Sequence, residues 1–418
     1  MRLRRPYAPR MEEATSPRGT RDNLCGLGGR PLPIDTRTHR VVWRWCWLAR
    51  ALARWAAGVV AALATVLVAA FPAGAAPLRH VQFTAISFAT ITTGWVVGPG
   101  FVWYTADSGR HWQSQYRGPI QFAGVDAVSS TVAYAWGGTT LLATADGGHR
   151  WVARYQGPGR ALSFSAVSRT RGYLVTSAGL DATSDGGRTW VAGHHPPAIA
   201  QVRMRVGGTG WALTSTDRVY KTTDGGRTWS LSFVLPDAHD GNGQGGYATG
   251  TLVVGTGGAV WVVFAGGYGM GQNSFAVYRT LDGGARWAAS VAVGTAGGGP
   301  PPGVATHVST GPMVPGGTGS SPGPLVTFGA RSALLLGVCR FCSGATVDVV
   351  ATSNGGLRWS RPVSISQSDG GLPTMLDLSF PTATTGWLAL WGANSGQSRI
   401  LVTHNAGRTW RVMWKEHS

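Results

Sequence analysis

Short apolar runs alternate with polar, glycine-rich segments through most of the chain after residue 77. Four of these runs, at residues 83–88, 125–128, 162–167 and 202–206, are each followed by a turn and a second run that begins with an aromatic residue. Those aromatic residues are Trp95, Tyr134, Tyr173 and Trp211. Runs of this length between turn-forming residues are typical of β-strands. The pattern predicts units of four short strands, and therefore an all-β domain made of repeats.

An octet of the form Thr-x-Asp/Asn-x-Gly-x-x-Trp closes each unit and occurs seven times. Its acidic or amide position is occupied by Asp107, Asp146, Asp185, Asp224, Asp282, Asn354 and Asn405, and its last position by Trp112, Trp151, Trp190, Trp229, Trp287, Trp359 and Trp410. The first three steps between these tryptophans are 39 residues each, and the later steps are 58, 72 and 51 residues. Surface loops tolerate such insertions.

The octet has the chemistry of a hairpin turn. An Asp or Asn side chain can accept hydrogen bonds from backbone N–H groups one or two residues further on, and glycine permits a positive φ. The tryptophan then begins the outgoing strand, where its ring can be buried against a neighbouring repeat while its N–H finds a partner. An asparagine oxygen accepts the same bond, so the two Asn copies fit the turn.

The octet resembles the Asp-box (BNR) repeat of β-propellers, which occurs in sialidases, xyloglucanases, sortilin and the photosystem II stability/assembly factor family. This resemblance implies a single seven-bladed propeller of four-stranded antiparallel blades over residues 77–418, in which the box residues are structural and not catalytic. The whole-chain resemblance is closest to the photosystem II stability/assembly factor family, which implies an exported propeller that holds a partner. Neither end of the domain shows an obvious strand exchange that would close the ring.

The N-terminal region predicts export. Residues 1–40 are rich in Arg, Pro and Gly, and we expect a disordered, basic cytoplasmic tail. Residues 41–76 contain an uncharged apolar run at 55–71, which fits either a cleaved signal peptide or an N-terminal transmembrane anchor. In both cases the preceding arginines place the propeller outside the cytoplasmic membrane, either anchored or secreted.

Composition narrows the functions further. The formal net charge is +18, but no stripe of basic residues with interleaved aromatics predicts nucleic-acid binding. The long Gly/Pro-rich insertion at 294–324 is expected to be a surface loop. Cys339 and Cys342 predict a disulfide that pins a loop, since no second Cys pair completes a zinc site. No metal or other cofactor is expected.

The acidic residues argue against one enzyme class and leave another open. Glutamate occurs only at Glu12, Glu13 and Glu416, so no Glu between residues 14 and 415 can supply the acidic base of a sialidase. The Phe/Tyr-Arg-Ile-Pro signature that precedes the boxes of that family is also missing, and sialidase activity is therefore not expected. An aspartate pair would still suffice for a glycoside hydrolase. The candidates outside the octets are Asp126, Asp181, Asp217, Asp237, Asp240, Asp348, Asp369 and Asp377.

Alignment of the inner strands on the aromatic residue that follows gives a column of mostly small, polar residues. Its members are Ser87, Asp126, Ser165, Arg203 and Ser379. Asp126 and Arg203 interrupt the column, and they form either a salt bridge between strands or part of a binding site. In the second interpretation Arg203 and Arg205 make a basic patch that receives an acidic side chain or a C-terminal carboxylate.

Two functions follow from these observations. The first is a non-catalytic scaffold similar to photosystem II assembly factors, which binds a protein partner such as a subunit of a membrane complex. Its membrane contact would be the N-terminal segment if that segment is not cleaved. The alternative is an Asp-based glycoside hydrolase or a glycan-binding propeller of the cell envelope.

Overall fold

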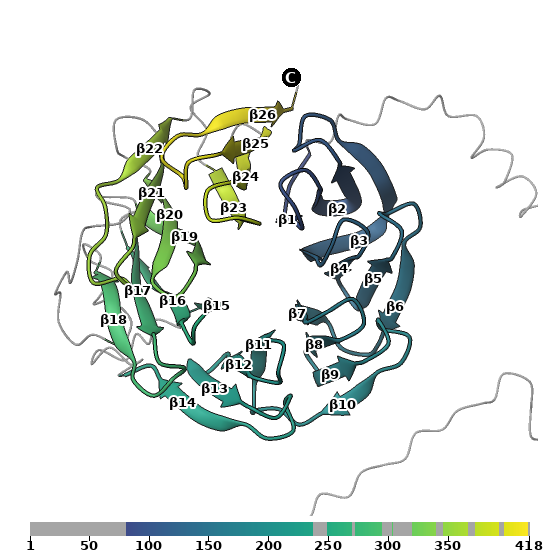
Figure 1. Cartoon of the computed structure of the whole chain (residues 1–418), viewed down its shortest axis with the longest axis horizontal. Helices are drawn as coiled ribbons and strands as arrows, with labels where there is room; N and C mark the ends of the chain where they lie inside the picture. The colour runs from purple at the N-terminus through teal and green to yellow at the C-terminus, as the bar shows by residue number, and fades with distance from the viewer. Residues whose placement is uncertain are drawn as a thin grey trace, which may run out of the picture. The chain divides into compact units, whose positions relative to one another are not determined.

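The computed structural model describes residues 81–236, 249–269, 272–294, 303, 320–339, 346–366, 373–392 and 397–416. These residues form 26 strands, arranged as sheets around a central opening (Figure 1). The predicted all-β propeller is therefore confirmed. Among the residues described, no helix is long and apolar enough to cross a membrane. The predicted tail at 1–40 and export segment at 41–76 lie outside the described residues.

The described strands form six sheets, each with its strands in sequence order across the sheet. The largest sheet contains β1 (Ala85–Phe88), β2 (Gly94–Thr105), β3 (Gln113–Ala127), β4 (Ala133–Gly137), β5 (Thr140–Thr144) and β6 (Val152–Gln156). The second contains β7 (Ala161–Ala166), β8 (Gly172–Thr176), β9 (Gly179–Thr183) and β10 (Val191–Gly193). The third contains β11 (Ile199–Met204), β12 (Gly210–Thr214), β13 (Arg218–Thr222) and β14 (Ser230–Val234).

The remaining three sheets have four strands each. The fourth contains β15 (Thr249–Val254), β16 (Val260–Gly269), β17 (Gln272–Thr280) and β18 (Ala288–Val293). The fifth contains β19 (Ser320–Phe328), β20 (Ser332–Cys339), β21 (Thr346–Thr352) and β22 (Val363–Ser366). The sixth contains β23 (Pro373–Ser379), β24 (Gly386–Gly392), β25 (Ser398–Thr403) and β26 (Arg411–Lys415).

The prediction of seven separate four-stranded blades is wrong, because the described strands form six sheets. The difference arises in β3, which runs without a break through Gly118 and Pro119 although such a pair is typical of a turn. The part of β3 that begins at Gln113 pairs with β2, and the part that ends at Ala127 pairs with β4. The first two repeats therefore share one strand and form a single six-stranded sheet.

Two further predictions concern the later repeats. The insertion expected at 294–324 is shorter than predicted, since β19 already begins at Ser320. Most of the rest of that insertion lies outside the described residues. The predicted disulfide between Cys339 and Cys342 also lies outside the described residues.

Large aromatic residues fill the space between repeats. Trp95, Trp211, Trp261 and Trp387 are each at most 2% exposed, and each lies at or near the start of the second strand of its repeat. Burial of a tryptophan removes a large apolar area from water, so these side chains contribute strongly to the packing of adjacent repeats. The sequence pattern that placed an aromatic residue here therefore marks the core.

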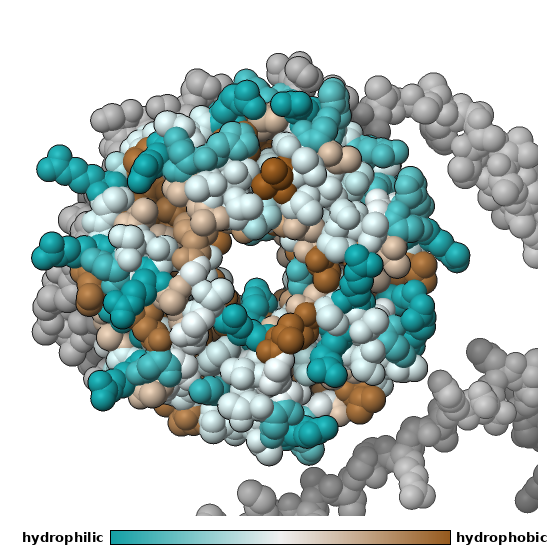
Figure 2. All heavy atoms as spheres, viewed as in Figure 1, coloured by the Kyte–Doolittle hydropathy of each residue, from teal (hydrophilic) through white to brown (hydrophobic). Residues whose placement is uncertain are grey.

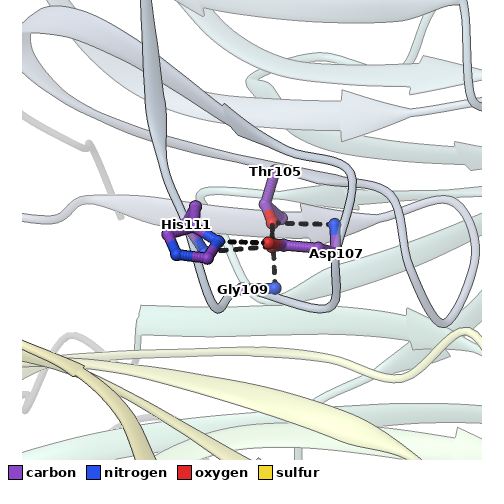
Figure 3. Close-up of polar contacts among 4 residues, drawn as sticks. All are labelled: Thr105, Asp107, Gly109 and His111. Atoms are coloured by element: carbon purple, nitrogen blue, oxygen red, sulfur yellow. Dashed lines mark hydrogen bonds and ion pairs between the residues drawn. The ribbon is translucent and has the colours of Figure 1, made fainter.

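All seven octets form the same turn, which we call the box turn. In the first (Figure 3), Thr105 Oγ1 donates to Asp107 Oδ1 (2.9 Å) and accepts from the backbone N–H of Gly109 (2.9 Å). Asp107 Oδ1 also accepts from the backbone N–H of His111 (3.0 Å). The contact between threonine and the Asp or Asn is 2.7–3.0 Å in the box turns that begin at Thr144, Thr183, Thr222, Thr280, Thr352 and Thr403.

Most box tryptophans also bond to the preceding repeat. Five indole N–H groups donate to it, namely those of Trp151 (to Gln115), Trp190 (to Arg154), Trp229 (to His194), Trp287 (to Ser232) and Trp359 (to Ser290). Two tryptophans differ. Within the described residues the buried indole nitrogen of Trp112 has no partner, and Trp410 donates to Gly407 of its own turn (3.1 Å).

Within the described residues, no strand is exchanged between the first and last sheets, as expected. Glu416 joins its two ends, since one carboxylate oxygen accepts from Val81 N (2.8 Å) and the other from Ser398 N (3.2 Å). The hydroxyl of Ser398 in turn donates to the carbonyl of Val81. The rings of Phe83 and Trp414 pack beside this contact, with centroids 5.3 Å apart. Side chains therefore connect the first and last sheets.

Candidate functional site: the central cavity

A cavity of about 580 Å³ lies among the inner strands of the ring, where Figure 2 shows an opening. Residues of β1, β3, β7, β11 and β23 contribute to its wall. Asp126, Arg203 and Arg205, the residues predicted to bind a partner, all line it. Asp377, one of the candidates for the hydrolase alternative, lines the same cavity. The fold thus brings together four candidate residues that come from three separate parts of the sequence.

The predicted column of inner-strand residues is confirmed by strand register. Each member lies opposite the aromatic residue of the next strand: Ser87 opposite Trp95, Asp126 opposite Tyr134, Ser165 opposite Tyr173, Arg203 opposite Trp211, and Ser379 opposite Trp387. These five residues therefore occupy equivalent positions in five repeats.

Four column residues make the same hydrogen bond to the next repeat around the ring. Ser87 Oγ accepts from Ala127 N (3.0 Å), Asp126 Oδ2 from Ala166 N (3.0 Å), Ser165 Oγ from Met204 N (3.0 Å), and Ser379 Oγ from Phe88 N (2.8 Å). Each donor follows directly after a column residue. The column is thus a ring of acceptors that joins adjacent repeats. The sequence alone did not predict this role, because it depends on which N–H lies across the interface.

Arg203 cannot take part in this ring, because a guanidinium group has donors and no acceptor. Its Nη1 donates instead to Ser163 Oγ (3.0 Å) and to the Val202 carbonyl (2.9 Å). The acceptor is displaced by two residues to Gln201, whose Oε1 accepts from Leu252 N (3.0 Å). The repeat has therefore kept its connection to the next sheet while placing a cation in the cavity wall.

No salt bridge within 4.0 Å joins Arg203 to a carboxylate in the part of the chain that the structure describes. The salt-bridge alternative for Asp126 and Arg203 is therefore not realised. Arg205 likewise donates to a backbone carbonyl, that of Gly255. Both arginines are fixed by neutral acceptors, so their charges are not neutralised by direct contact with an acid.

Burial shifts the pKa values of the charged groups in this cavity. Burial raises the pKa of Asp377 to about 6, although N–H groups of Ile86 and Leu378 and the charge of Arg203 act in the opposite direction. Burial also raises the pKa of Asp126, against the effects of the Ala166 N–H and Arg203. It lowers the pKa of Arg203, against the effects of both carboxylates. Arg203 thus interacts electrostatically with each of the two carboxylates without direct contact.

The other aspartate candidates do not line this cavity. Asp181 accepts from the Tyr155 hydroxyl (3.1 Å), and Asp348 accepts from Ser364 (2.6 Å). Burial raises the pKa of Asp217 to about 6. Three further candidates, Asp237, Asp240 and Asp369, lie outside the described residues. Among the residues described, no cluster of His, Cys, Asp or Glu is suited to hold a metal ion.

The chain resembles known proteins in its fold. No protein-family model and no curated protein matches the chain. Among solved structures, the GH74 xyloglucanase from Xanthomonas campestris has a TM-score of 0.55 at 12% identity, over 80% of this chain and 55% of that chain. YCF48 from Cyanidioschyzon merolae has a TM-score of 0.50 at 16% identity, over 80% of this chain and 98% of that chain.

A structure of YCF48 bound to D1 peptide also matches, with a TM-score of 0.41 and 16% identity, over 80% of this chain and 83% of that chain. The chain spans about half the length of the xyloglucanase. The similarities to the xyloglucanase and to YCF48 from Cyanidioschyzon merolae define the class: the chain has a β-propeller fold like theirs. At this level of identity they concern the fold alone.

Proposed function

We propose that this chain is a non-catalytic, protein-binding propeller that acts outside the cytoplasmic membrane as an assembly scaffold, similar in role to photosystem II assembly factors. The partner class is a subunit of a membrane complex. The observation that carries this proposal is the position of Arg203. Among the five column residues that the structure describes, four are acceptors that join repeats. The fifth, Arg203, presents a guanidinium group instead, and Gln201 acts as the acceptor of its repeat.

The group that the cavity recognises is an acidic side chain or a C-terminal carboxylate of the partner. Arginine binds carboxylates through paired, charge-assisted hydrogen bonds. Nη1 of Arg203 is engaged by Ser163 and Val202, which orients the group and leaves its remaining donors for a ligand. Arg205 lines the same cavity and supplies a second positive charge.

The acidic residues of the cavity make this binding depend on pH. An ionised Asp377 opposes a bound carboxylate, and its pKa of about 6 means that it becomes neutral as the pH falls below that value. A partner carboxylate with an ordinary pKa near 4 stays ionised over the same range. Partner binding is therefore expected to strengthen between pH 7.5 and pH 5.5.

Affinity capture from the native membrane fraction tests the proposal, with the tagged full-length chain as bait and mass spectrometry as the readout. The variant Arg203→Gln/Arg205→Gln should recover about tenfold less partner than the wild type, because it loses charge-assisted hydrogen bonds. The control Arg110→Gln/Arg227→Gln removes the same charge from two exposed positions and should recover a normal amount. Equal recovery by the cavity variant and the wild type would overturn the proposal.

A glycoside hydrolase or glycan-binding propeller is the second candidate, because Asp126, Asp377 and the aromatic side chain of Trp136 line one cavity. Asp377→Asn separates the two functions. For a carboxylate-binding scaffold this variant should strengthen partner capture at pH 7.5, since it removes a negative charge. For a hydrolase it should abolish any cleavage detected in a screen of envelope glycans. Because Asp126 and Asp377 both accept backbone N–H bonds, we favour the first function.

A further inference from the structure

The last two box turns differ in charge from the first five. The first five contain aspartate, and in the third the hydroxyl and backbone N–H of Thr189 hold the pKa of Asp185 at about 2. That aspartate is therefore ionised at neutral pH. The last two box turns contain Asn354 and Asn405, which accept the same turn hydrogen bonds without a charge.

The interface between the fifth and sixth sheets also differs. The tryptophan of the last box turn, Trp410, does not donate to the preceding repeat as five of the other tryptophans do. Its indole N–H bonds to Gly407 within its own turn. Among the described residues, the hydrogen bond that a box tryptophan usually donates to the repeat before it is thus missing at this interface.

A groove of about 980 Å³ coincides with this interface and is lined by residues of both sheets. Apolar side chains on the fifth sheet, including Leu334, Val349 and Val363, contribute to its wall. Val363 is 37% exposed, so part of this apolar surface is accessible to solvent. Trp359 also contributes, and the turn of the sixth sheet forms the other side. An aromatic or aliphatic side chain of a ligand would find apolar partners here.

The charged residues of the groove are all basic. Arg358, Arg361 and Arg408 line it, and no Asp or Glu is among the lining residues. All three arginines are exposed. Within the described residues no side-chain hydrogen bond or salt bridge engages their guanidinium groups. The two box turns beside the groove contain Asn instead of Asp. These turns therefore place no carboxylate next to the three arginines.

We propose that this groove is a second binding site, which takes a segment of a partner protein that carries acidic side chains next to a large apolar side chain. The apolar side chain packs against Val363 and its neighbours, and the acidic side chains bind the three arginines. Charge complementarity selects the occupant, because the rim offers donors without competing carboxylates. This site is separate from the central cavity and does not depend on the function proposed for it.

A phage-displayed library of random peptides about twelve residues long, selected against the full-length chain, provides the probe. The enriched peptides should contain at least two Asp or Glu residues close to a Trp, Phe or Leu. Fluorescence anisotropy with a labelled peptide should show about tenfold weaker binding to Arg358→Gln/Arg361→Gln/Arg408→Gln. The control Arg110→Gln/Arg150→Gln/Arg227→Gln removes three exposed box arginines elsewhere and should change the affinity less than about twofold.

A second variant tests the same site in case the arginine variant does not fold. Asn354→Asp/Asn405→Asp restores the residue that five box turns already contain, so the turns should form normally. It adds two negative charges at the groove and should weaken peptide binding about threefold or more. Arg203→Gln/Arg205→Gln in the central cavity should leave this binding unchanged.

Three results would overturn the proposal. The first is an enriched peptide set without acidic residues. The second is peptide affinity that is unaffected by both groove variants, or reduced equally by the control. The third is binding of phosphatidylglycerol vesicles that the groove variants abolish while no peptide binds, which would assign the groove to a lipid surface.

Discussion

The threonine that begins each box turn is buried, and its hydroxyl both donates and accepts a hydrogen bond. In the third repeat, Thr183 Oγ1 donates to Asp185 Oδ1 (2.9 Å) and accepts from Gly187 N (2.8 Å). Thr183 is only 4% exposed, so water cannot replace the acceptor if the hydroxyl is removed. Thr189 ends the same turn, but it is exposed and contacts only the other oxygen of Asp185 with its hydroxyl.

These two threonines give a matched test of the turn. Thr183→Val keeps the shape of the side chain but leaves the Gly187 N–H unsatisfied, and should lower the free energy of unfolding by about 1–3 kcal/mol. Thr189→Val should lower it by less than about 1 kcal/mol, since an exposed partner bonds to water instead. Urea unfolding followed by circular dichroism measures both. If the two variants were equally destabilised, the buried hydroxyl would not be what holds the turn.

At the scale of strands, adjacent sheets are joined by side chains that accept backbone N–H bonds from the next inner strand. The connection between β11 and β15 rests on Gln201, which accepts from Leu252 N (3.0 Å) and donates to the Gly250 carbonyl (2.6 Å). Because the Arg203 side chain has no acceptor, this amide carries the connection that the column residue carries in neighbouring repeats.

Removal of that amide should loosen β15 locally. In Gln201→Leu the Leu252 amide should exchange its hydrogen about tenfold faster or more than in the wild type, since a buried donor loses its partner. Hydrogen exchange followed by NMR or mass spectrometry detects this effect on the segment that contains β15. Gln121→Leu, at an exposed position of β3, serves as the control. Unchanged exchange at β15 in the first variant would mean that packing alone joins these strands.

The elements that the sequence predicted well are those fixed by local chemistry. The octets predicted turns because Thr, Asp or Asn and Gly act within a few residues of one another. The aromatic residues such as Trp95 and Trp211 marked buried strands because an indole ring needs a packed environment. The inner-strand column, with Arg203 and Asp126, followed from the same alignment, so these polar residues of the central cavity were found without the structure.

What the sequence did not predict depends on contacts between distant segments. Gly118 and Pro119 have the composition of a turn, yet they lie inside β3, because pairing to β2 on one side and β4 on the other keeps the strand extended. The acceptor role of Ser87 and the groove beside Trp410 likewise require knowledge of which group lies across an interface. A single sequence carries no such information.

For the molecule as a whole, the joint between the first and last sheets determines whether the ring is complete. Glu416, the only glutamate in the described residues, accepts from Val81 and Ser398 with separate oxygens. Phe88 and Trp387 stack across the same interface, with ring centroids 3.7 Å apart. The joint thus combines the hydrogen bonds of Glu416, which we call the Glu416 clasp, with aromatic packing.

The contribution of the Glu416 clasp to stability can be measured directly. Glu416→Gln leaves only one acceptor oxygen for two N–H donors, and should lower the melting temperature by about 2–6 °C. Limited proteolysis near Val81 should also become faster, because the first strand loses its anchor. The exposed substitution Arg227→Gln should change neither readout. A normal melting temperature and normal proteolysis in Glu416→Gln would show that aromatic packing is sufficient to close the ring.

The way the ring closes also sets the order in which the molecule can be assembled. Neighbouring repeats are joined by bonds between residues about 40 positions apart, such as Ala127 with Ser87 and Ala166 with Asp126. The bond between Val81 and Glu416 spans 335 positions, and contacts of such long range form late. A chain that emerges from the N-terminus onward can therefore build its sheets one after another. The edge of the first sheet remains open to other chains until the sixth sheet and Glu416 have been made.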